Sequence, residues 1–297
     1  MSTNDVLVTV VVFTYNSSKT VIESLESVKE QTYSNIQLIV TDDGSSDTTI
    51  EICRKWLNIN GKHFYDFSLI TIESNKGTSA NCNRALNASK GEWIKFIAGD
   101  DALKKECIEV NMNYITANGE IELLQTNADM YMDVFEDANF KSTLPVNFKE
   151  FFNIKDGKSQ YNFIKNVGYA ICTPAVFIKK SIIENAGGFD ERFRLIEDLP
   201  LWLNLTKSGV RFYYHPVSTV NYRSHDKSVS RNGKKYMNAM FAKDALFFLK
   251  TYFSKKEKNF KIKKNIFQLQ CLIFLDEKGF NNESIISKLL YSVVNRI

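Results

Sequence analysis

The first hundred residues alternate short β-branched runs with segments of helical period. Valine- and isoleucine-rich runs predict strands, and apolar residues spaced by three or four predict amphipathic helices between them. The predicted strands are Val6–Phe13, Ile36–Thr41, Ser68–Ile72 and Trp93–Ala98. The predicted helices run from Val21 to about Gln31, onward from a cap at Asp47, and over Thr78–Ala88. This order is typical of βαβ units and predicts an α/β fold with a mainly parallel sheet flanked by helices.

The pattern is less regular after the fourth strand. The elements expected there are a helix near 104–117, a strand near 123–127, a flexible polar loop over 136–158, order again from Tyr161, a helix that opens at Glu197-Asp198 and stops near Gly209, and a strand over 217–222. From Lys234 onward, long helical segments rich in Phe, Leu, Ile and Lys predict a helical extension. We therefore expect a larger domain over 1–232, with halves of about 1–101 and 102–232, and an extension over 233–297.

Composition places the chain among ordinary globular proteins. The 297 residues are 44% hydrophobic and 24% charged, and a formal net charge of +4 is too small to indicate a nucleic-acid partner. The five cysteines lie far apart and lack C-x-x-C spacing, which disfavours disulfides and zinc and suggests a cytoplasmic protein. The apolar run Val6–Phe13 follows Asp5 and is too short for a signal peptide or a membrane span.

A polar, turn-forming cluster follows each of the first four predicted strands. The clusters are Tyr15-Asn16-Ser17, Asp42-Asp43-Gly44-Ser45, Asn75-Lys76-Gly77 and Gly99-Asp100-Asp101. Because ligands of open α/β sheets bind at the carboxyl ends of the strands, these clusters should converge on one site.

Three acidic clusters carry candidate chemistry, and each has a plainer alternative. Asp42 could accept hydrogen bonds from a base or a ribose, or it could belong to a simple turn before a helix cap. Asp100 and Asp101 suit Mg²⁺ or Mn²⁺ bridged to a diphosphate, although Gly-Asp-Asp is also good turn chemistry. Asp198, preceded by Glu197, could take the proton of an acceptor hydroxyl, or it could only cap a helix.

The segment Tyr222-Arg223-Ser224-His225 follows the last predicted strand. The imidazole of His225 could complete a metal shell, and Arg223 could pair with a phosphate. A loop histidine is more often exposed and silent, so this signal is weak when taken alone.

Seven motifs in one order resemble the family 2 glycosyltransferases with the GT-A fold. They are Val-Phe-Thr-Tyr-Asn (12–16), Asp-Asp-Gly-Ser-Ser-Asp (42–47), Asn-Lys-Gly-Thr-Ser (75–79), Gly-Asp-Asp (99–101), Gly-Gly-Phe-Asp-Glu (187–191), Glu-Asp (197–198) and Tyr-Arg-Ser-His (222–225). Each motif is common, but their order over residues 6–230 is hard to reach by chance.

The resemblance implies an inverting transferase that uses a UDP-sugar and a divalent metal. It places Tyr15, Asp42 and the backbone near Phe13 at the uracil, and it assigns the base to Asp198 with Glu197 beside it. The remaining residues that it implies are Asn75, Gly77, Asn83, Asp100 and Arg223 at the nucleotide-sugar, and Asp100, Asp101 and His225 at the metal.

Two positions depart from the family pattern. Ala98 replaces the first acidic residue of the Asp-x-Asp-Asp motif, so metal binding would depend on Asp100 and Asp101 without distinguishing them. Cys82 replaces an arginine in the helix after the Asn-x-Gly turn, although Asn83 fits the next position. Because of these departures, the chain could also be a catalytically degenerate family member that binds sugar nucleotides as a scaffold.

Other nucleotide enzymes fit less well. A sugar nucleotidylyltransferase would be expected to carry a Gly-rich basic loop after the first strand, where this chain has Tyr15-Asn16-Ser17-Ser18, and a dehydrogenase would need G-x-G-x-x-G. By analogy with small members of the family, the expected role is assembly of a bacterial surface polysaccharide such as an O-antigen or capsule repeat unit.

The C-terminal helices allow two interpretations. Aromatic residues near Phe247 beside Lys255, Lys256, Lys263 and Lys264 could lie on an anionic membrane that holds a lipid-linked saccharide acceptor, which would place the protein at the inner face of the membrane. Alternatively, these helices form a packed subdomain with a solvated lysine face, or a homodimer interface.

Overall fold

The computed structural model describes residues 6–146, 149–166, 171–225, 236, 238–253 and 260–296. These residues fall into two compact units. The first holds the chain up to Asp190 together with Asp198–Ser224, and the second holds Glu191–Glu197 and the chain from His225 onward. The boundary expected near Gly233 lies outside the described residues, and the sequence pattern gave no sign that 191–197 leaves the first unit.

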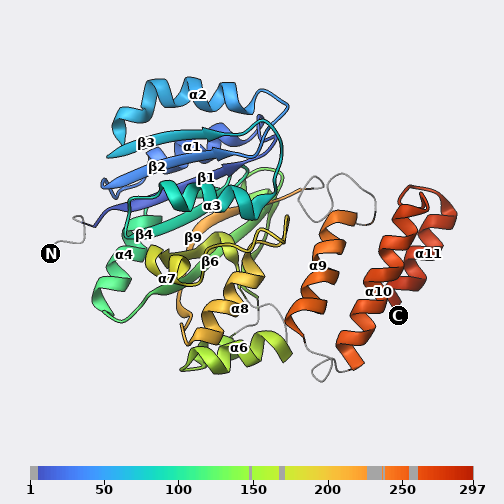
Figure 1. Cartoon of the computed structure of the whole chain (residues 1–297). Coiled ribbons are helices and arrows are strands. Elements are labelled where there is room, and N and C mark those ends of the chain that lie inside the picture. The colour runs from blue at the N-terminus through green and yellow to red at the C-terminus, as the bar shows by residue number, and fades with distance from the viewer. Residues whose placement is uncertain are drawn as a thin grey trace. The chain divides into compact units, whose positions relative to one another are not determined.

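The first unit is built on one mixed sheet (Figure 1). Among the described residues, the strand order is β3-β2-β1-β4-β8-β6-β9-β5, with β7 paired to β6. The strands are β1 Val8–Thr14, β2 Ile36–Asp42, β3 Asp66–Thr71, β4 Trp93–Ala98, β5 Ala102–Leu103, β6 Leu123–Met132, β7 Phe140–Leu144, β8 Val176–Lys179 and β9 Tyr213–Ser224. Strands β1 to β4 are parallel, β8 is antiparallel to β4 and β6, and β6 and β9 are parallel. The predicted mixed, mainly parallel sheet is confirmed.

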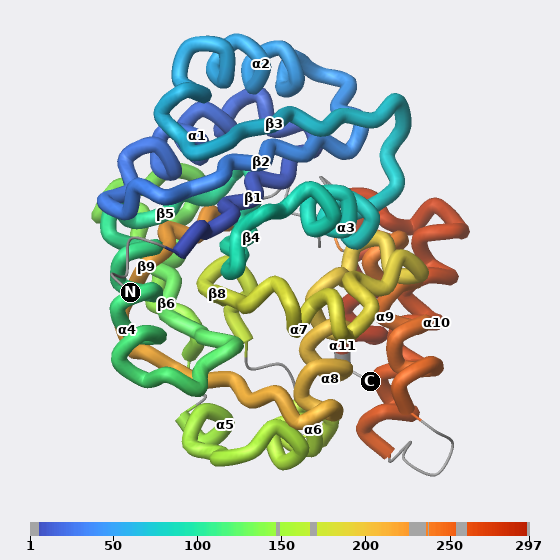
Figure 2. Tube along the Cα trace, turned by 60° about the vertical axis from the view of Figure 1, so that its left-hand side comes forward, coloured from blue at the N-terminus to red at the C-terminus, as the bar shows by residue number. Residues whose placement is uncertain are grey.

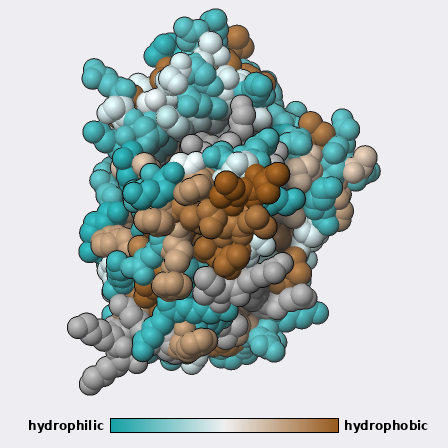
Figure 3. Space-filling view, turned by 90° about the vertical axis from the view of Figure 1, so that its right-hand side faces the viewer, coloured by the Kyte–Doolittle hydropathy of each residue, from teal (hydrophilic) through white to brown (hydrophobic). Residues whose placement is uncertain are grey.

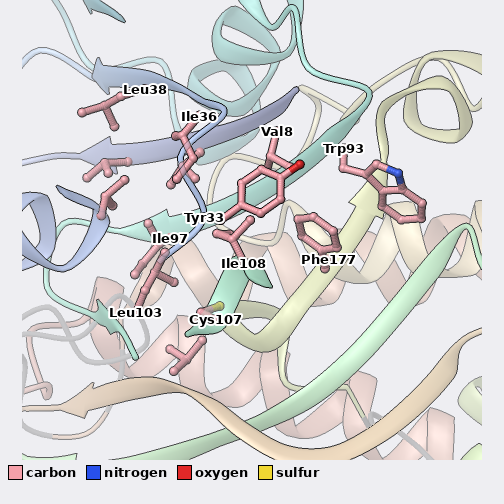
Figure 4. Close-up of a cluster of buried hydrophobic side chains, with 14 of the residues drawn as sticks. Val8, Tyr33, Ile36, Leu38, Trp93, Ile97, Leu103, Cys107, Ile108 and Phe177 are labelled. Atoms are coloured by element: carbon pink, nitrogen blue, oxygen red, sulfur yellow. The ribbon is translucent and has the colours of Figure 1, made fainter. Parts of the chain in front are cut away.

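Helices cover both faces of the four parallel strands. They are α1 Val21–Lys29, α2 Thr49–Asn60, α3 Thr78–Ala88 and α4 Cys107–Ala117. Leu25 of α1, Trp56 of α2 and Ile108 of α4 share one buried cluster, whereas α3 lies on the opposite face (Figure 2). In that cluster the rings of Trp93 and Phe177 stack at 5.2 Å and join β4 to β8 (Figure 4). Because this burial fixes the strands, it also fixes the loops at their carboxyl ends.

The stretch from Glu136 to Lys158 is not the irregular loop that its polar composition predicts. It contains β7, helix α5 over Lys149–Asn153 and the start of helix α6 over Gly157–Asn166. Strand β7 pairs antiparallel with β6, and Phe151 is fully buried. The prediction was wrong because strand β7 and helix α5 depend on partners that are distant in sequence.

Two short helices and one tight turn complete the first unit. Helix α7 spans Lys180–Asn185, helix α8 spans Asp198–Ser208, and the 3-10 turn η4 covers Thr173–Ala175 just before β8. Helix α8 is followed by Gly209, which has φ +106°, a conformation that glycine adopts without strain.

The second unit contains helices α9 Ala239–Tyr252, α10 Phe260–Glu277 and α11 Ile285–Arg296. Segment 191–197 packs on α9, where the rings of Phe193 and Phe247 lie 5.1 Å apart. Helices α10 and α11 share a small core that includes Tyr291. The predicted helical extension is confirmed, and none of the helices in the described ranges is long and apolar enough to cross a membrane.

Candidate active site

The loops after β1, β2 and β3 meet one another. The backbone N–H of Asn16 donates to Ser45 Oγ at 2.7 Å, and Ser46 N–H donates to Asn16 Oδ1 at 2.9 Å. Gly44 has φ +77°, and a Cβ there would lie 2.9 Å from the backbone nitrogen of Asn75. Only glycine permits both this conformation and this close approach. The clusters therefore converge as their positions at strand ends predict.

The two aspartates after β2 have different surroundings. Asp42 is fully buried and accepts hydrogen bonds from Thr14 Oγ1 at 2.7 Å and from the Ser45 backbone at 2.7 Å. Asp43 accepts from the Gly77 N–H and from Arg84 Nη2, each at 2.7 Å. Asp43 and Arg84, which sequence reasoning missed, thus hold the turn that contains Asn75 and Gly77.

The other residues expected at the nucleotide differ in how open they are. The Tyr15 side chain is 51% exposed at the end of β1, whereas Asn75 is half-buried. The Phe13 carbonyl accepts from Gly99 N–H at 3.0 Å. Asn83 uses its amide on the backbone of Phe189, donating at 2.9 Å and accepting at 2.8 Å. Tyr15 is therefore the most accessible of these groups, and ligand contacts by the others stay predictions.

Side chains fix the acidic turn formed by residues 98–101. Three of its four carbonyl groups accept hydrogen bonds from side chains. Thr20 Oγ1 donates to the Gly99 carbonyl at 2.7 Å, Arg223 Nε to the Asp100 carbonyl at 2.7 Å, and Ser24 Oγ to the Asp101 carbonyl at 2.5 Å. Because three donors from two elements hold this backbone, the turn is preorganised before any ligand binds.

Arg223 is the most heavily engaged of these donors. It is 6% exposed, its backbone N–H donates to the Asp101 carboxylate at 2.8 Å, and its guanidinium also bonds the Asp133 carbonyl and the Glu23 carboxylate. The guanidinium lies 4.0 Å from the centroid of the Phe135 ring. These contacts give Arg223 a role in holding the acidic turn, and its expected pairing with a phosphate stays a prediction.

The structure separates the two predicted metal ligands. Asp101 is 2% exposed, and burial raises its pKa well above the usual range, with a further increase from the charge of Asp100. Asp100 is only half-buried. Within the described ranges, no three His, Cys, Asp or Glu side chains are grouped to hold a metal ion. Asp100 is therefore the more open carboxylate of the turn.

Asp198 lies at the start of α8, where the sequence predicts it. Its Oδ2 accepts a hydrogen bond of 2.6 Å from Thr173 Oγ1 on turn η4. Burial raises the pKa of Tyr222, and the charges of Asp101, Asp100 and Asp198 raise it further. Tyr222 directly precedes Arg223, whose backbone N–H bonds the Asp101 carboxylate. Sequence reasoning missed Thr173, because nothing local in the sequence connects it to Asp198, and it named Tyr222 in the Tyr-Arg-Ser-His motif without giving it a role.

Glu197 and His225 belong to the second compact unit. Both side chains are half-buried. Their expected places beside the base and at the metal therefore stay predictions.

The fold and the acidic loops at its strand ends define a GT-A type glycosyltransferase. The family model described as "Glycosyl transferase family 2" matches residues 9–185. The chain belongs to glycosyl transferase family 2, as the seven motifs predict.

Similar proteins agree with this class. The chain is 27% identical over 230 residues to WfaP of Escherichia coli, a UDP-Glc:alpha-D-GlcNAc-diphosphoundecaprenol beta-1,3-glucosyltransferase, covering 76% of this chain and 80% of WfaP. It is 23% identical over 254 residues to the amylovoran biosynthesis glycosyltransferase AmsB of Erwinia amylovora, covering 82% of this chain and 78% of AmsB. The crystal structure of S. aureus TarS 1-349 in complex with UDP-GlcNAc has a TM-score of 0.59 at 16% identity and covers 97% of this chain and 79% of that one.

Proposed function

We propose that this protein is an inverting glycosyltransferase that moves a hexose or N-acetylhexosamine from a UDP-sugar to an acceptor hydroxyl, with Asp198 as the base. The observation that carries this proposal is a chain of two hydrogen bonds. Thr173 Oγ1 donates to Asp198 Oδ2 at 2.6 Å, and Lys95, on the strand that runs into the acidic turn, donates to the carbonyl of the next residue, Pro174, at 2.6 Å. A candidate base and a candidate metal-binding turn are thus held to the same part of the sheet. An inverting transfer needs this pairing, because the acceptor is deprotonated while the diphosphate leaves.

Asp100 would hold Mn²⁺ or Mg²⁺, with Asp101 behind it. The donor set fits such an ion, since Mg²⁺ usually takes one or two carboxylates and completes its shell with phosphate oxygens and water. When bound, the metal stabilises negative charge on the departing UDP. Asp101, buried and bonded to the Arg223 backbone, would orient the turn rather than face the ligand.

Asp198 would take the proton from the acceptor hydroxyl as that oxygen attacks the sugar carbon. The hydrogen bond from Thr173 leaves further lone pairs on the Asp198 carboxylate, which can accept several bonds. Direct displacement turns an α-linked donor into a β-linked product, and no enzyme nucleophile is needed.

The proposed donor is a UDP-sugar. The fold matches that of TarS in complex with UDP-GlcNAc, and the printed name of WfaP states a UDP-glucose donor. The accessible Tyr15 ring would stack on the uracil at the end of β1. A mannosyltransferase of the same fold binds GDP-Man and Mn²⁺, at a TM-score of 0.54 and 16% identity, so a guanine nucleotide is the competing donor.

The proposed acceptor is a saccharide on a lipid diphosphate, as the name of WfaP states for that enzyme. Two helices of the second unit could bring the protein to such a lipid. Phe260, Phe267 and Phe274 recur every seven residues on α10 and are 83%, 53% and 56% exposed. Lys263 and Lys264 are exposed on the same helix, whereas Lys255 and Lys256 lie outside the described residues. Exposed aromatics beside lysines suit an anionic bilayer surface.

Helix α11 adds a second exposed apolar stripe. Its members are more than half exposed and are spaced to share one helix face: Ile285, Ile286, Leu289 and Val293. Figure 3 shows an apolar patch within polar surroundings on the face where these helices lie. Patches of this kind mark interaction sites, and a second copy of the chain is the competing partner.

Stereochemistry tests the transfer reaction. The chain would be incubated with UDP-glucose or UDP-N-acetylglucosamine, Mn²⁺ and a lipid-diphosphate N-acetylglucosamine acceptor, and the product would be analysed by NMR. A β-linked product that disappears in Asp198→Asn supports the proposal. An α-linked product would contradict the inverting mechanism, and UDP binding without transfer would favour the scaffold interpretation.

Flotation with vesicles tests the membrane contact. We expect the wild-type chain to float with vesicles that contain anionic lipid and not with neutral ones, and the double substitution Lys263→Glu, Lys264→Glu to abolish flotation. The matched control is Lys62→Glu, Lys90→Glu on the first unit, where both lysines are also exposed. Unchanged flotation of the helix variant, or a dimer that dissociates on Leu289→Ser, would contradict the membrane proposal.

A further inference from the structure

Three polar side chains near the active site are completely buried, and the proposed chemistry uses none of them. Lys95, Gln125 and Thr126 are each 0% exposed. Burying a polar group destabilises a fold unless the group finds hydrogen-bond partners, and burying a charge destabilises it more. Apolar residues would fill the same space more favourably. Their presence therefore needs a reason beyond packing.

All three side chains bond to the backbone of one short segment, residues 172–176. Lys95 Nζ donates to the Pro174 carbonyl at 2.6 Å and to the Val176 carbonyl at 3.3 Å. Lys95 lies on β4, the strand that ends in the acidic turn. The buried Lys95 amine therefore ties this segment directly to the strand that leads into the turn with Asp100.

Gln125 and Thr126 of β6 hold the same segment from the other side. The Gln125 amide accepts from the Cys172 N–H at 3.1 Å and donates to the Cys172 carbonyl at 3.2 Å. Thr126 Oγ1 donates to the Ala175 carbonyl at 3.0 Å. Together with Lys95, these bonds fix the backbone on both sides of Thr173.

The Thr173 side chain is held in place by these hydrogen bonds. Its hydroxyl donates to Asp198 Oδ2 at 2.6 Å and receives the indole N–H of Trp202 at 3.3 Å. Trp202 is 3% exposed and lies four residues after Asp198, on the same face of α8. An indole N–H can only donate, and a hydroxyl has one hydrogen, so Trp202 directs the Thr173 hydrogen toward Asp198.

We propose that Thr173 is a positioning residue that fixes the rotamer of the base Asp198, and that Lys95, Gln125 and Thr126 are buried in order to hold Thr173. This inference depends on the proposed function, because it assigns Asp198 the role of base. It explains why a lysine and two other polar side chains are retained in the core. It also couples the base to β4, so that Asp198 and the acidic turn are held to one strand.

The first test replaces the hydroxyl and keeps the shape of the side chain. We expect Thr173→Val to lower kcat by about one to two orders of magnitude, since a misplaced catalytic group costs about a hundredfold. The KM for UDP-glucose or UDP-N-acetylglucosamine and the affinity for UDP with Mn²⁺ should stay within about twofold, because the acidic turn is untouched. Thr173→Ser should recover most of kcat. The control Thr9→Val removes another fully buried hydroxyl, at the far end of β1, and should leave kcat unchanged.

A double-substitution cycle shows whether Thr173 acts through Asp198. In the Asp198→Asn background, Thr173→Val should have no further effect on the residual rate. Lys95→Met should resemble Thr173→Val in its loss of kcat with retained UDP binding. Normal kcat in Thr173→Val, or an equal loss in the Asp198→Asn background, would overturn the inference and leave the proposed function standing. If the wild-type chain neither binds UDP nor turns over either donor, the proposed function fails, and this inference fails with it.

Discussion

Two turns of the first unit are fixed in the same way but in different surroundings. The acidic turn 98–101 and the η4 turn both have backbone carbonyls that accept hydrogen bonds from side chains of distant elements. One turn carries the candidate metal ligand Asp100, and the other holds the candidate base Asp198 through Thr173. Each reacting group thus has its own support, which predicts separate effects on nucleotide binding and on chemistry.

The difference lies in how deep the supports are. We call the hydrogen bonds of the Arg223 guanidinium to the Asp100 carbonyl and the Glu23 carboxylate the clamp on the acidic turn. This clamp reaches the surface, since the Glu23 side chain is 53% exposed. The donors to η4 are fully buried. Changes at the surface can therefore alter the acidic turn, whereas changes in the core at Lys95 or Thr126 are expected to alter the segment that holds the base.

The largest effect is expected at the base. Asp198→Asn should lower kcat by about 10²- to 10⁴-fold, the usual contribution of a positioned general base. Binding of UDP with Mn²⁺ should be unchanged, because the acidic turn has separate supports. Steady-state UDP release, with UDP affinity measured on the same samples, checks this prediction. Weaker UDP binding would mean that the two sites are not separate.

The next effect is expected at the metal. Asp100→Asn should weaken Mn²⁺-dependent UDP binding by more than about 100-fold, since even residues behind metal ligands contribute about 10- to 100-fold. Asp101→Asn should be milder, because the amide oxygen can still accept from the Arg223 backbone. Electron paramagnetic resonance of bound Mn²⁺ measures both variants. A larger loss of Mn²⁺-dependent UDP binding in Asp101→Asn than in Asp100→Asn would mean that Asp101 is the metal ligand and Asp100 the residue that orients the turn.

A smaller effect is expected at the clamp. Arg223→Met keeps the length of the side chain but removes its hydrogen bonds to the Asp100 and Asp133 carbonyls. Mn²⁺-dependent UDP affinity should fall by about 10- to 100-fold. The matched control is Arg211→Met, because Arg211 also bonds a carbonyl and lies 4.4 Å from an aromatic ring centroid, away from the acidic turn. Equal losses in both variants would indicate general destabilisation.

The smallest effect is expected where the clamp reaches solvent. Glu23→Gln should change Mn²⁺-dependent UDP affinity by at most about fivefold, or about 1 kcal/mol, because exposed ion pairs contribute little. The difference from wild type should vanish at high salt, where the Debye length falls to about 3 Å. Titrations at low and high ionic strength check this, and a salt-independent loss would mean that Glu23 acts through shape rather than charge.

The sequence predicted the first half of the fold well because its signals are local. Helix Thr78–Ala88 and strand Trp93–Ala98 have the predicted bounds, since caps, periodicity and turn residues act within a few positions. The failure at 136–158 has the opposite cause. Strand β7 exists because it pairs with β6, and α5 because Phe151 finds a buried place, and neither partner is visible in a local pattern.

The candidate site divides in the same way. The position of Asp100 at a strand end could be predicted, because strand ends are local and the crevice rule is general. The donors that hold it could not, since Thr20 and Arg223 lie 79 and 123 positions away from the carbonyls that they bond. The role of Arg84 could not be predicted either. Arg84 lies two positions after Cys82, the residue that replaces the expected arginine, and it donates a hydrogen bond to Asp43. Such partners are set by tertiary packing.

Our central claim is that the acidic turn controls nucleotide binding and that Asp198 acts only in the chemical step. Calorimetric titration with UDP, with and without Mn²⁺, is its most direct test. It would compare the wild-type chain with Asp100→Asn and Asp198→Asn. We predict that UDP binds the wild-type chain only with Mn²⁺, that Asp100→Asn weakens this binding by more than about 100-fold, and that Asp198→Asn leaves it intact. Binding that is independent of Mn²⁺, or that is lost equally in both variants, would contradict the account.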